Sequence, residues 1–386
     1  MTTMKKVLFI THAGNPGGAE YKMISLCRAI GKTAEAMLFQ HGHLETLLQE
    51  ENIGFSVHPM PSRITNFHKE NGLVKILKMV PPTLSMAGEV AREARHYDIV
   101  VCMSQKSFII ASLAKPLMKK PIVWFMNDLL SPEHFNKILI LLLVVLSRIT
   151  ASHIVLNSQA SYDAWIKSGG RRKNVNIIYS GIDGGKIDSD LRDKEEINRH
   201  KKAFSPDGKP LVGIFGRITS WKGQDVFLEA VAKVAGINAM IVGDCFFGED
   251  KYLESLKDAV KSLGIESRVT FTGHRDDIEK LMAACDIAAH CSTAPEPFGR
   301  VIVEAMMCGT PVIAANAGGA REIVIDGETG QLTPPGEVQA LAEAMQKYLD
   351  RPEWAAQMAK KAKARAKELF SEDALIEKSM KIIDNL

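Results

Sequence analysis

Short apolar runs alternate with stretches of helical periodicity in the first half of the chain. KKVLFITHA, at 5–13, is the first such run, and AEYKMISLCRAI, at 19–30, has apolar residues at helical spacing. Four more apolar runs follow: YDIVVCMS, KPIVWFMND, SHIVLNS and VNIIYSGID. Buried strands that succeed one another through helices predict βαβ units in a parallel sheet.

The alternation stops at 183–208, which is highly charged and contains no apolar run, and we interpret this segment as a linker. A second series then begins with PLVGIFG, NAMIVGD, RVTFTG, DIAAHCS and TPVIAAN. We therefore predict an α/β protein with two doubly wound, Rossmann-like domains, at 1–182 and 183–365. A chain of 386 residues fits two domains better than one core.

Composition and charge describe an ordinary globular protein, with 46% hydrophobic and 24% charged residues. Residues 1–190 hold 22 Lys and Arg against 15 Asp and Glu, which leaves 26 against 30 of the 48 and 45 in the whole chain. The basic first half suits an anionic surface or acceptor, but so mild an excess predicts no nucleic-acid partner.

The six cysteines are scattered without metal-ligand spacing, and several lie in apolar runs, so we expect buried free thiols in a reducing, cytoplasmic compartment. The longest apolar run, ILILLLVVLS at 138–147, is half the length of a membrane span. We expect it to form a buried helix. Peripheral contact of the first domain with the inner face of a membrane is the alternative, together with the basic segment FHKENGLVKILKMVPP at 67–82.

The first strand leads into Gly14, Gly17 and Gly18, and a helix follows. Glycines let a ligand approach the backbone, and a helix N-terminus favours an anion. The loop has neither the Walker A pattern nor GxGxxG spacing, so a simple tight turn is an equally good interpretation.

Cationic side chains follow the first strand of the second domain in GIFGRITSWKGQD. Arg217 offers a bidentate fork to phosphate oxygens and Lys222 a point charge, at the strand end where doubly wound sheets bind ligands. Two solvated cations in a loop are the alternative.

Two carboxylates lie eight residues apart in EPFGRVIVEAMMCG. Pro297 keeps Glu296 out of helical conformation, whereas Glu304 lies inside a predicted helix, 300–308, that ends at Gly309. Glu296 and Glu304 could form an acid/base pair, but their placement favours a grip on the hydroxyls of a ligand. A DxD motif at 188–190 lies away from any predicted strand end, so we do not interpret it as a metal site.

These motifs resemble a known family. GGAE, GRITSWKG and EPFGRVIVEAMMCGTPVIAANAGGAREIVIDGETGQL occur in the order found in the retaining glycosyltransferases of family four, which have the GT-B fold. The resemblance implies that the second domain binds a nucleotide-sugar and the first binds the acceptor, with the site in the cleft between them. It also implies that no metal or other cofactor is needed and that a terminal helix, 366–386, packs back on the first domain.

The resemblance implies a role for each matching residue. Arg217 and Lys222 would neutralise the diphosphate in place of a metal, and Glu296 would hold the donor sugar near Phe298 and Gly299. The remaining implied contacts are Glu304 with the ribose, Val301 with the nucleoside, Arg275 with the base, and Gly17 and Gly18 with the sugar and diphosphate.

One position departs from the family pattern. Asn127-Asp128 follows the KPIVWFM strand, where the family commonly has His-Asp. Asn127 can donate and accept hydrogen bonds near the reacting sugar, but its amide cannot take up or release a proton at neutral pH. His12, at the end of the first strand, is a second candidate for that place. The predicted function is transfer of a hexose from a nucleoside-diphosphate sugar, with UDP favoured, to a hydroxyl acceptor. An epimerase and a non-catalytic binding protein remain alternatives.

Overall fold

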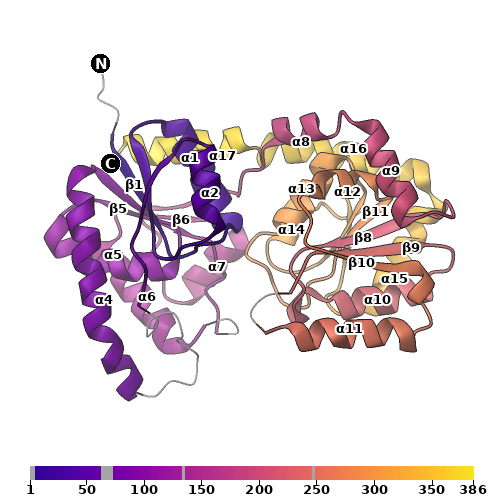
Figure 1. The fold of residues 1–386 in the computed structure, drawn as a ribbon, viewed down its shortest axis with the longest axis horizontal. Helices are drawn as coiled ribbons and strands as arrows, with labels where there is room; N and C mark the ends of the chain where they lie inside the picture. Colours follow the sequence, from indigo (N-terminus) through magenta and orange to yellow (C-terminus); the bar gives the residue numbers. More distant parts are fainter. Residues whose placement is uncertain (1–4, 62–72, 133–134, 246–247) are drawn as a thin grey trace. The chain divides into compact units, whose positions relative to one another are not determined.

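In the computed structural model, which describes residues 5–61, 73–132, 135–245 and 248–386, the chain divides into two compact units. Unit 1 comprises 1–181 and 372–386, and unit 2 comprises 182–371 (Figure 1). The predicted fold class is confirmed, because each unit contains one parallel sheet with helices on both faces. The last helix, α17, belongs to unit 1, as predicted for a terminal helix that returns to the first domain.

The sheet of unit 1 has seven parallel strands in the order β3-β2-β1-β4-β5-β6-β7. β1 lies in the centre, with Val7 opposite Ala34 of β2 on one side and Ile99 of β4 on the other. The strands are β1 Val7–Thr11, β2 Ala34–Leu38, β3 Gly54–Val57, β4 Ile99–Cys102, β5 Ile122–Met126, β6 His153–Leu156 and β7 Val175–Ile177. The helices are α1 Gly18–Ile30, α2 His43–Glu50, α4 Leu73–Glu93, α5 Gln105–Met118, α6 Lys137–Thr150, α7 Gln159–Lys167 and α17 Glu372–Asp384.

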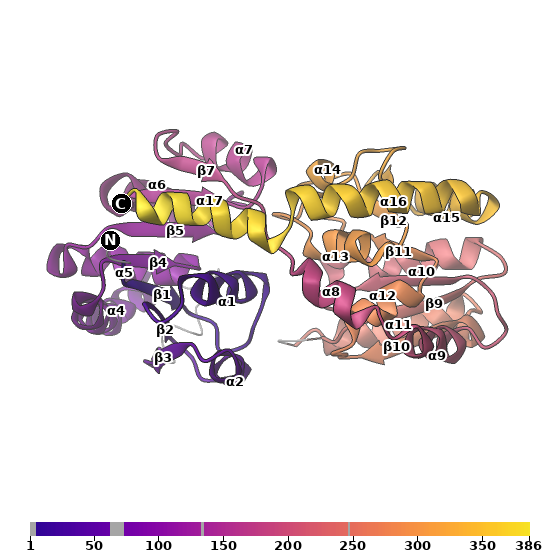
Figure 2. The ribbon, with the colours of Figure 1, turned by 90° about the horizontal axis from the view of Figure 1, so that it is seen from above.

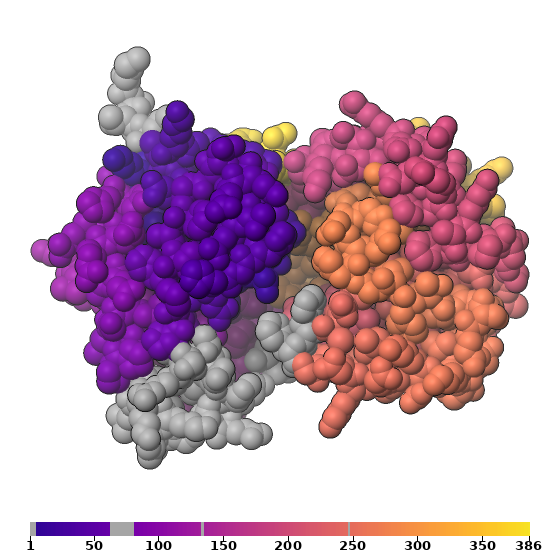
Figure 3. All heavy atoms as spheres, viewed as in Figure 1, coloured from indigo at the N-terminus to yellow at the C-terminus, as the bar shows by residue number. Residues whose placement is uncertain are grey.

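Alternate residues of these strands enter two different cores, as the period of two requires. Leu8 and Ile10 pack in the core covered by α4, α5 and α6, whereas Val7 and Phe9 pack in the core covered by α1, α2 and α17. Figure 2 shows α17 lying along unit 1, where Arg28 of α1 contacts its first residue, Glu372, at 2.6 Å. In Figure 3 the indigo residues, which include α1 and α2, make up most of the visible face of this unit.

The sheet of unit 2 has six parallel strands in the order β10-β9-β8-β11-β12-β13. Its strands are β8 Leu211–Phe215, β9 Asn238–Val242, β10 Val269–Gly273, β11 Ile287–His290, β12 Val312–Ala315 and β13 Gln331–Thr333. Its helices are α8 Gly184–Asp190, α9 Lys194–Phe204, α10 Gln224–Lys233, α11 Asp250–Ser262, α12 Ile278–Ala284, α13 Arg300–Cys308, α14 Ala320–Ile323, α15 Val338–Asp350 and α16 Pro352–Leu369.

The charged segment 183–208, interpreted above as a linker, is part of unit 2. It forms α8 and α9, with Ile187 and Ile197 as their buried residues. Two anchoring isoleucines among many charges are too few to form an apolar run, which is why the pattern did not reveal these helices.

The prediction that the apolar run 138–147 forms a buried helix is wrong, because only one face of this helix is buried. The run lies in α6, whose Ile140, Leu143 and Val144 are buried, while other large apolar side chains of the same helix face solvent. Among the described helices, none combines the length and apolar character needed to cross a membrane. All six cysteines are free, and four of them are buried, as expected.

Candidate functional site

The loops after β8 and β11 carry the predicted charged residues of the site, Arg217, Lys222 and Glu296, together with Phe298 and Gly299. These neighbouring strands continue in opposite directions across the sheet, β8 to β9 and β11 to β12, so the sheet has its topological switch point here. Arg217 and Lys222 follow β8, and Glu296 follows β11. The fold thereby brings Lys222 and Glu296 into contact, with Nζ 2.6 Å from Oε1, although they are 74 residues apart.

Glu296 lies at the centre of a buried polar cluster. Its Oε1 accepts hydrogen bonds from Lys222 Nζ at 2.6 Å and from His290 Nε2 at 2.8 Å, and also from the Ser292 hydroxyl. The side chains of Glu296 and His290 are 8% and 6% exposed. All three hydrogen bonds fall on Oε1, so among the described residues Oε2 is the oxygen left to accept a hydrogen bond from a ligand.

The charge state of Glu296 decides between the two interpretations of the carboxylates. Burial by itself would raise the pKa of Glu296, but the charges of His290 and Lys222 and their hydrogen bonds hold it well below its usual value. The group is therefore ionised at neutral pH. An ionised carboxylate cannot act as a general acid, and one whose pKa is held low is a weak base, so a fixed hydrogen-bond acceptor is the favoured role.

The Gly318-Gly319 turn packs directly against the backbone of this cluster. Gly319 N donates to Glu296 O at 2.9 Å, and Gly318 has a φ of +57°. A Cβ on Gly318 would lie 2.2 Å from the same carbonyl oxygen, and one on Gly319 would lie 2.4 Å from Phe298 O. The two glycines thus hold the Glu296–Phe298 loop in place.

We expect Gly318→Ala to lower the free energy of unfolding of unit 2 by about 3 kcal/mol, because it adds left-handed strain to a backbone clash. Gly336→Ala is the matched control: its φ is +78° but a Cβ would meet nothing within 4 Å, so about 1 kcal/mol is expected. Urea unfolding of both variants measures the difference, and equal losses would contradict the packing argument.

Helix α13 begins and ends as the sequence predicted. It starts at Arg300 after Gly299, which provides no side-chain cap, and ends at Gly309 with a φ of +81°. Phe298 is buried against Phe370 at 5.6 Å between ring centroids. The uncapped first turn leaves backbone N–H groups that can bind an anion.

Glu304 is less buried than the sequence suggested, since 19% of its side chain is exposed. It accepts a hydrogen bond from Arg300 Nη2 at 3.0 Å, one helical turn earlier. Val301, which was predicted to contact the nucleoside, is half-buried on the same helix. Arg217, by contrast, is exposed and extends from the loop after β8.

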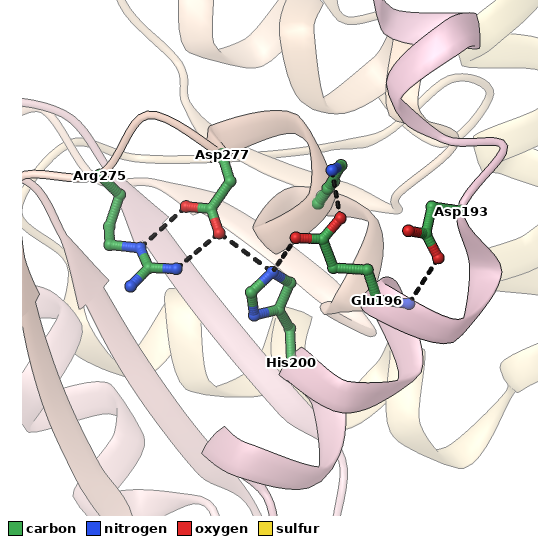
Figure 4. A network of polar contacts seen from close by, with 6 residues as sticks. Asp193, Glu196, His200, Arg275 and Asp277 are labelled. Carbon is green, nitrogen blue, oxygen red and sulfur yellow. Dashed lines mark hydrogen bonds and ion pairs between the residues drawn. The ribbon is translucent and has the colours of Figure 1, made fainter.

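Arg275 takes part in a charged network shown in Figure 4. Its guanidinium donates to both carboxylate oxygens of Asp277, at 2.8 and 2.5 Å, and Asp277 lies 3.0 Å from His200 Nε2. Among the described residues, Glu196, His200 and Asp277 bring three potential metal-ligand atoms together. Lys280 pairs with Glu196 and Arg275 with Asp277, so protein cations already balance both carboxylates.

The DxD motif lies in α8, away from the strand ends. Asp188 forms salt bridges with Lys363 at 3.1 Å and Lys367 at 2.5 Å, both on α16. Asp188 therefore joins two helices of unit 2.

In unit 1, the first glycine loop is closed by Glu20. Gly17 N donates to Glu20 Oε2 at 3.1 Å, and Thr11 at the end of β1 donates to Oε1 at 2.7 Å. Burial raises the pKa of Glu20 despite these bonds. Gly17 and Gly18 thus open α1 at the carboxyl end of β1, the edge where a doubly wound sheet binds ligands.

Asn127 lies at the carboxyl end of β5, and both the oxygen and the nitrogen of its side-chain amide form hydrogen bonds with other protein groups. Nδ2 donates to the carbonyls of Met103 and Phe125 at 3.0 and 3.2 Å, and Oδ1 accepts from Lys22 Nζ at 2.9 Å. Lys22 is 1% exposed. Asn127 therefore ties α1 to the ends of β4 and β5.

His12, the second candidate near that edge, is held neutral. Burial, and then the charge of Lys106, lower its pKa to about 4 from 6.5. Between these values the unfolded chain binds a proton that the folded chain does not, so stability falls as the pH decreases from 6.5 to 4.

We expect His12→Asn to remove up to about 3 kcal/mol of this pH-dependent loss in the free energy of unfolding. Urea unfolding of unit 1 from pH 7 to 4 measures it, and an unchanged pH profile would contradict it.

Three functional candidates escaped the sequence analysis. His290 and Ser292 at the end of β11 bind Glu296, and Lys22 binds Asn127. Polar residues that directly follow a buried strand are the signal that could have pointed to His290 and Ser292. No local pattern marks Lys22, which looks like an ordinary helix lysine.

Comparison with known proteins provides a family match and several relatives. The family described as Glycosyl transferases group 1 matches residues 195–365. The lipopolysaccharide core biosynthesis glycosyltransferase LpsE of Rhizobium meliloti is 32% identical over 148 residues, 38% of this chain and 42% of its own. The D-inositol 3-phosphate glycosyltransferase of Mycolicibacterium smegmatis is 32% identical over 183 residues, which are 47% of this chain and 41% of its own. The chain thus matches about two fifths of these relatives' length.

A similarity to solved structures extends over the whole chain. Anabaena HepE in complex with UDP-glucose is 36% identical, with a TM-score of 0.88 over 99% of this chain and 100% of its own. WaaG, described as a glycosyltransferase involved in lipopolysaccharide biosynthesis, is 19% identical with a TM-score of 0.71, which shows a shared fold alone. The architecture is therefore that of GT-B proteins.

Proposed function

This chain belongs to the glycosyl transferases group 1, and from that premise we propose its activity. We propose that the protein transfers a hexose from a nucleoside-diphosphate sugar to a hydroxyl acceptor. Unit 2 binds the donor and unit 1 binds the acceptor. The transfer is metal-independent, retains the anomeric configuration and serves glycan or glycoconjugate synthesis.

The observation that carries the proposal is the partly buried Lys222–Glu296 contact of 2.6 Å at the switch point of unit 2. A lysine at this edge supplies positive charge to a diphosphate, and the exposed Arg217 supplies a second, so protein cations take the role of a metal. Glu296 presents Oε2 to the sugar hydroxyls. Its ionised state suits an acceptor of hydrogen bonds from neutral hydroxyl groups.

A UDP-sugar is the donor that we favour. The support is that HepE, which is similar over the whole chain, was solved with UDP-glucose. The first turn of α13 faces the negative charge of the diphosphate, Glu304 binds the ribose hydroxyls and Val301 packs on the nucleoside. Arg275 borders the base from its network with Asp277.

In the reaction the bond between the anomeric carbon and the phosphate oxygen breaks, and the acceptor oxygen forms its bond to that carbon on the same face. The acceptor proton passes to the leaving phosphate oxygen. Lys222 and Arg217 stabilise the charge that develops on the diphosphate. Glu296 is held by three donors on Oε1, which suits positioning better than nucleophilic attack.

Nucleotide release from UDP-, GDP- and ADP-sugars, measured with and without EDTA, tests the proposal. We expect slow hydrolysis of one UDP-sugar, unchanged by EDTA, and no epimerised sugar in the recovered donor. An epimerised donor would favour an epimerase, and binding without any turnover would favour a non-catalytic protein.

A further inference from the structure

An apolar stripe runs along the exposed face of α6. Its members are large side chains between 42% and 74% exposed: Ile138, Leu141, Leu142, Val145 and Ile149. At 3.6 residues per turn they lie within an arc of roughly 100°, opposite the buried face that includes Leu143 and Val144. From Ile138 to Ile149 the stripe is ~17 Å long, within a helix of 14 residues. We call these five residues the α6 stripe.

The neighbouring helix α5 enlarges the apolar area. α5 and α6 pack together, and a hydrogen bond of 2.8 Å joins Ser112 to Thr150. Leu113 and Ile149, the chain neighbours of these two residues, are 39% and 74% exposed, and Leu117 one turn further along α5 is 65% exposed. Exposed apolar side chains that gather on two packed helices, rather than singly, mark an interaction site.

The charged residues of α5 and α6 are all of one sign. Residues 105–120 and 137–150, which cover both helices, contain six Lys and Arg and no Asp or Glu. Lys137 and Arg148 are exposed immediately beside Ile138 and Ile149, and Lys119 is exposed at the end of α5. The patch therefore combines apolar insertion with attraction to negative charge.

We infer that unit 1 docks on an anionic lipid bilayer through the α6 stripe, with α6 lying in the plane of the interface. A helix with exposed apolar residues flanked by cations inserts shallowly among lipid headgroups. A second copy would fit poorly, because a twofold contact through this patch would place like charges against one another. This docking is independent of the proposed sugar transfer.

The full chain should sediment with vesicles of phosphatidylcholine and phosphatidylglycerol, more weakly as salt increases, and much less with phosphatidylcholine alone. The variant Leu141→Gln/Val145→Gln/Ile149→Gln should bind the mixed vesicles at least about tenfold more weakly. The matched control is Leu263→Gln/Ile325→Gln, which replaces exposed apolar residues of unit 2 and should bind like the unaltered chain.

Absence of vesicle binding, or equal binding by the α6 variant, would overturn the inference. So would self-association that the α6 variant abolishes without any vesicle binding by the unaltered chain. If the triple variant does not fold, Ile149→Trp gives a second readout. Its fluorescence should shift to the blue with the anionic vesicles only, and an unchanged spectrum would overturn the inference.

Discussion

Replacing Lys222 by alanine should lower kcat/KM for sugar transfer by about 100- to 1,000-fold. The ammonium is a partly buried positive charge at the switch point, and a group that stabilises charge developing in the transition state contributes on this scale. The substitution also leaves Glu296 with His290 and Ser292 as its described partners, so donor binding should weaken too. Nucleotide release with the preferred donor measures the effect.

Lys257→Ala is the matched control for this variant. Lys257 lies in the same unit, 46% of its side chain is exposed and it pairs with Glu254 on the surface. Its removal should leave kcat/KM unchanged. Activity of Lys222→Ala within about threefold of the unaltered chain would exclude a role for Lys222 in stabilising the leaving group.

Replacing Glu296 by glutamine should lower kcat/KM by about 100-fold and also reduce stability. The change leaves Lys222, whose side chain is 15% exposed, without its counter-charge, and removing one partner of a largely buried pair costs about 3 kcal/mol. Both oxygens of a carboxylate can accept hydrogen bonds, so Oε2 is available to a ligand while Oε1 binds the protein, whereas the amide keeps one accepting atom. Donor turnover and thermal unfolding of unit 2 measure the two effects separately.

Glu304→Gln separates the two carboxylates. Glu304 lies on α13 and accepts a hydrogen bond from Arg300, so we expect a higher KM for the donor with kcat largely retained. Identical losses of kcat in Glu296→Gln and Glu304→Gln would contradict the separate roles assigned to them.

Local pattern predicted much of unit 2. Helix α13 begins at Arg300 and ends at Cys308, as expected from Pro297 before it and Gly309 after it. Glu296 lies on a loop, and the buried runs ending at Gly216 and His290 are strands. These features follow from steric restrictions within a few residues, which is why they are readable without tertiary information.

Some elements were missed because their signals are weak locally. β2 and β3 have the sequences AEAML and GFSV, in which polar or glycine residues interrupt the apolar pattern. They are strands because β1 and β2 provide hydrogen-bonding partners beside them. In α6 the pattern was strong but ambiguous, since a run that is apolar on all sides does not say which side faces the core.

The sequence by itself determined the α/β class, the loop position of Glu296, the limits of α13 and the cations that follow β8. Only the tertiary structure decided that Lys222, His290 and Ser292 converge on one oxygen of Glu296, that Lys22 binds Asn127, and that one face of α6 remains exposed. The physical reason is distance along the chain. Hydrogen bonds between residues 74 or 105 positions apart depend on how the strands are ordered in the sheet, and no local preference encodes that order.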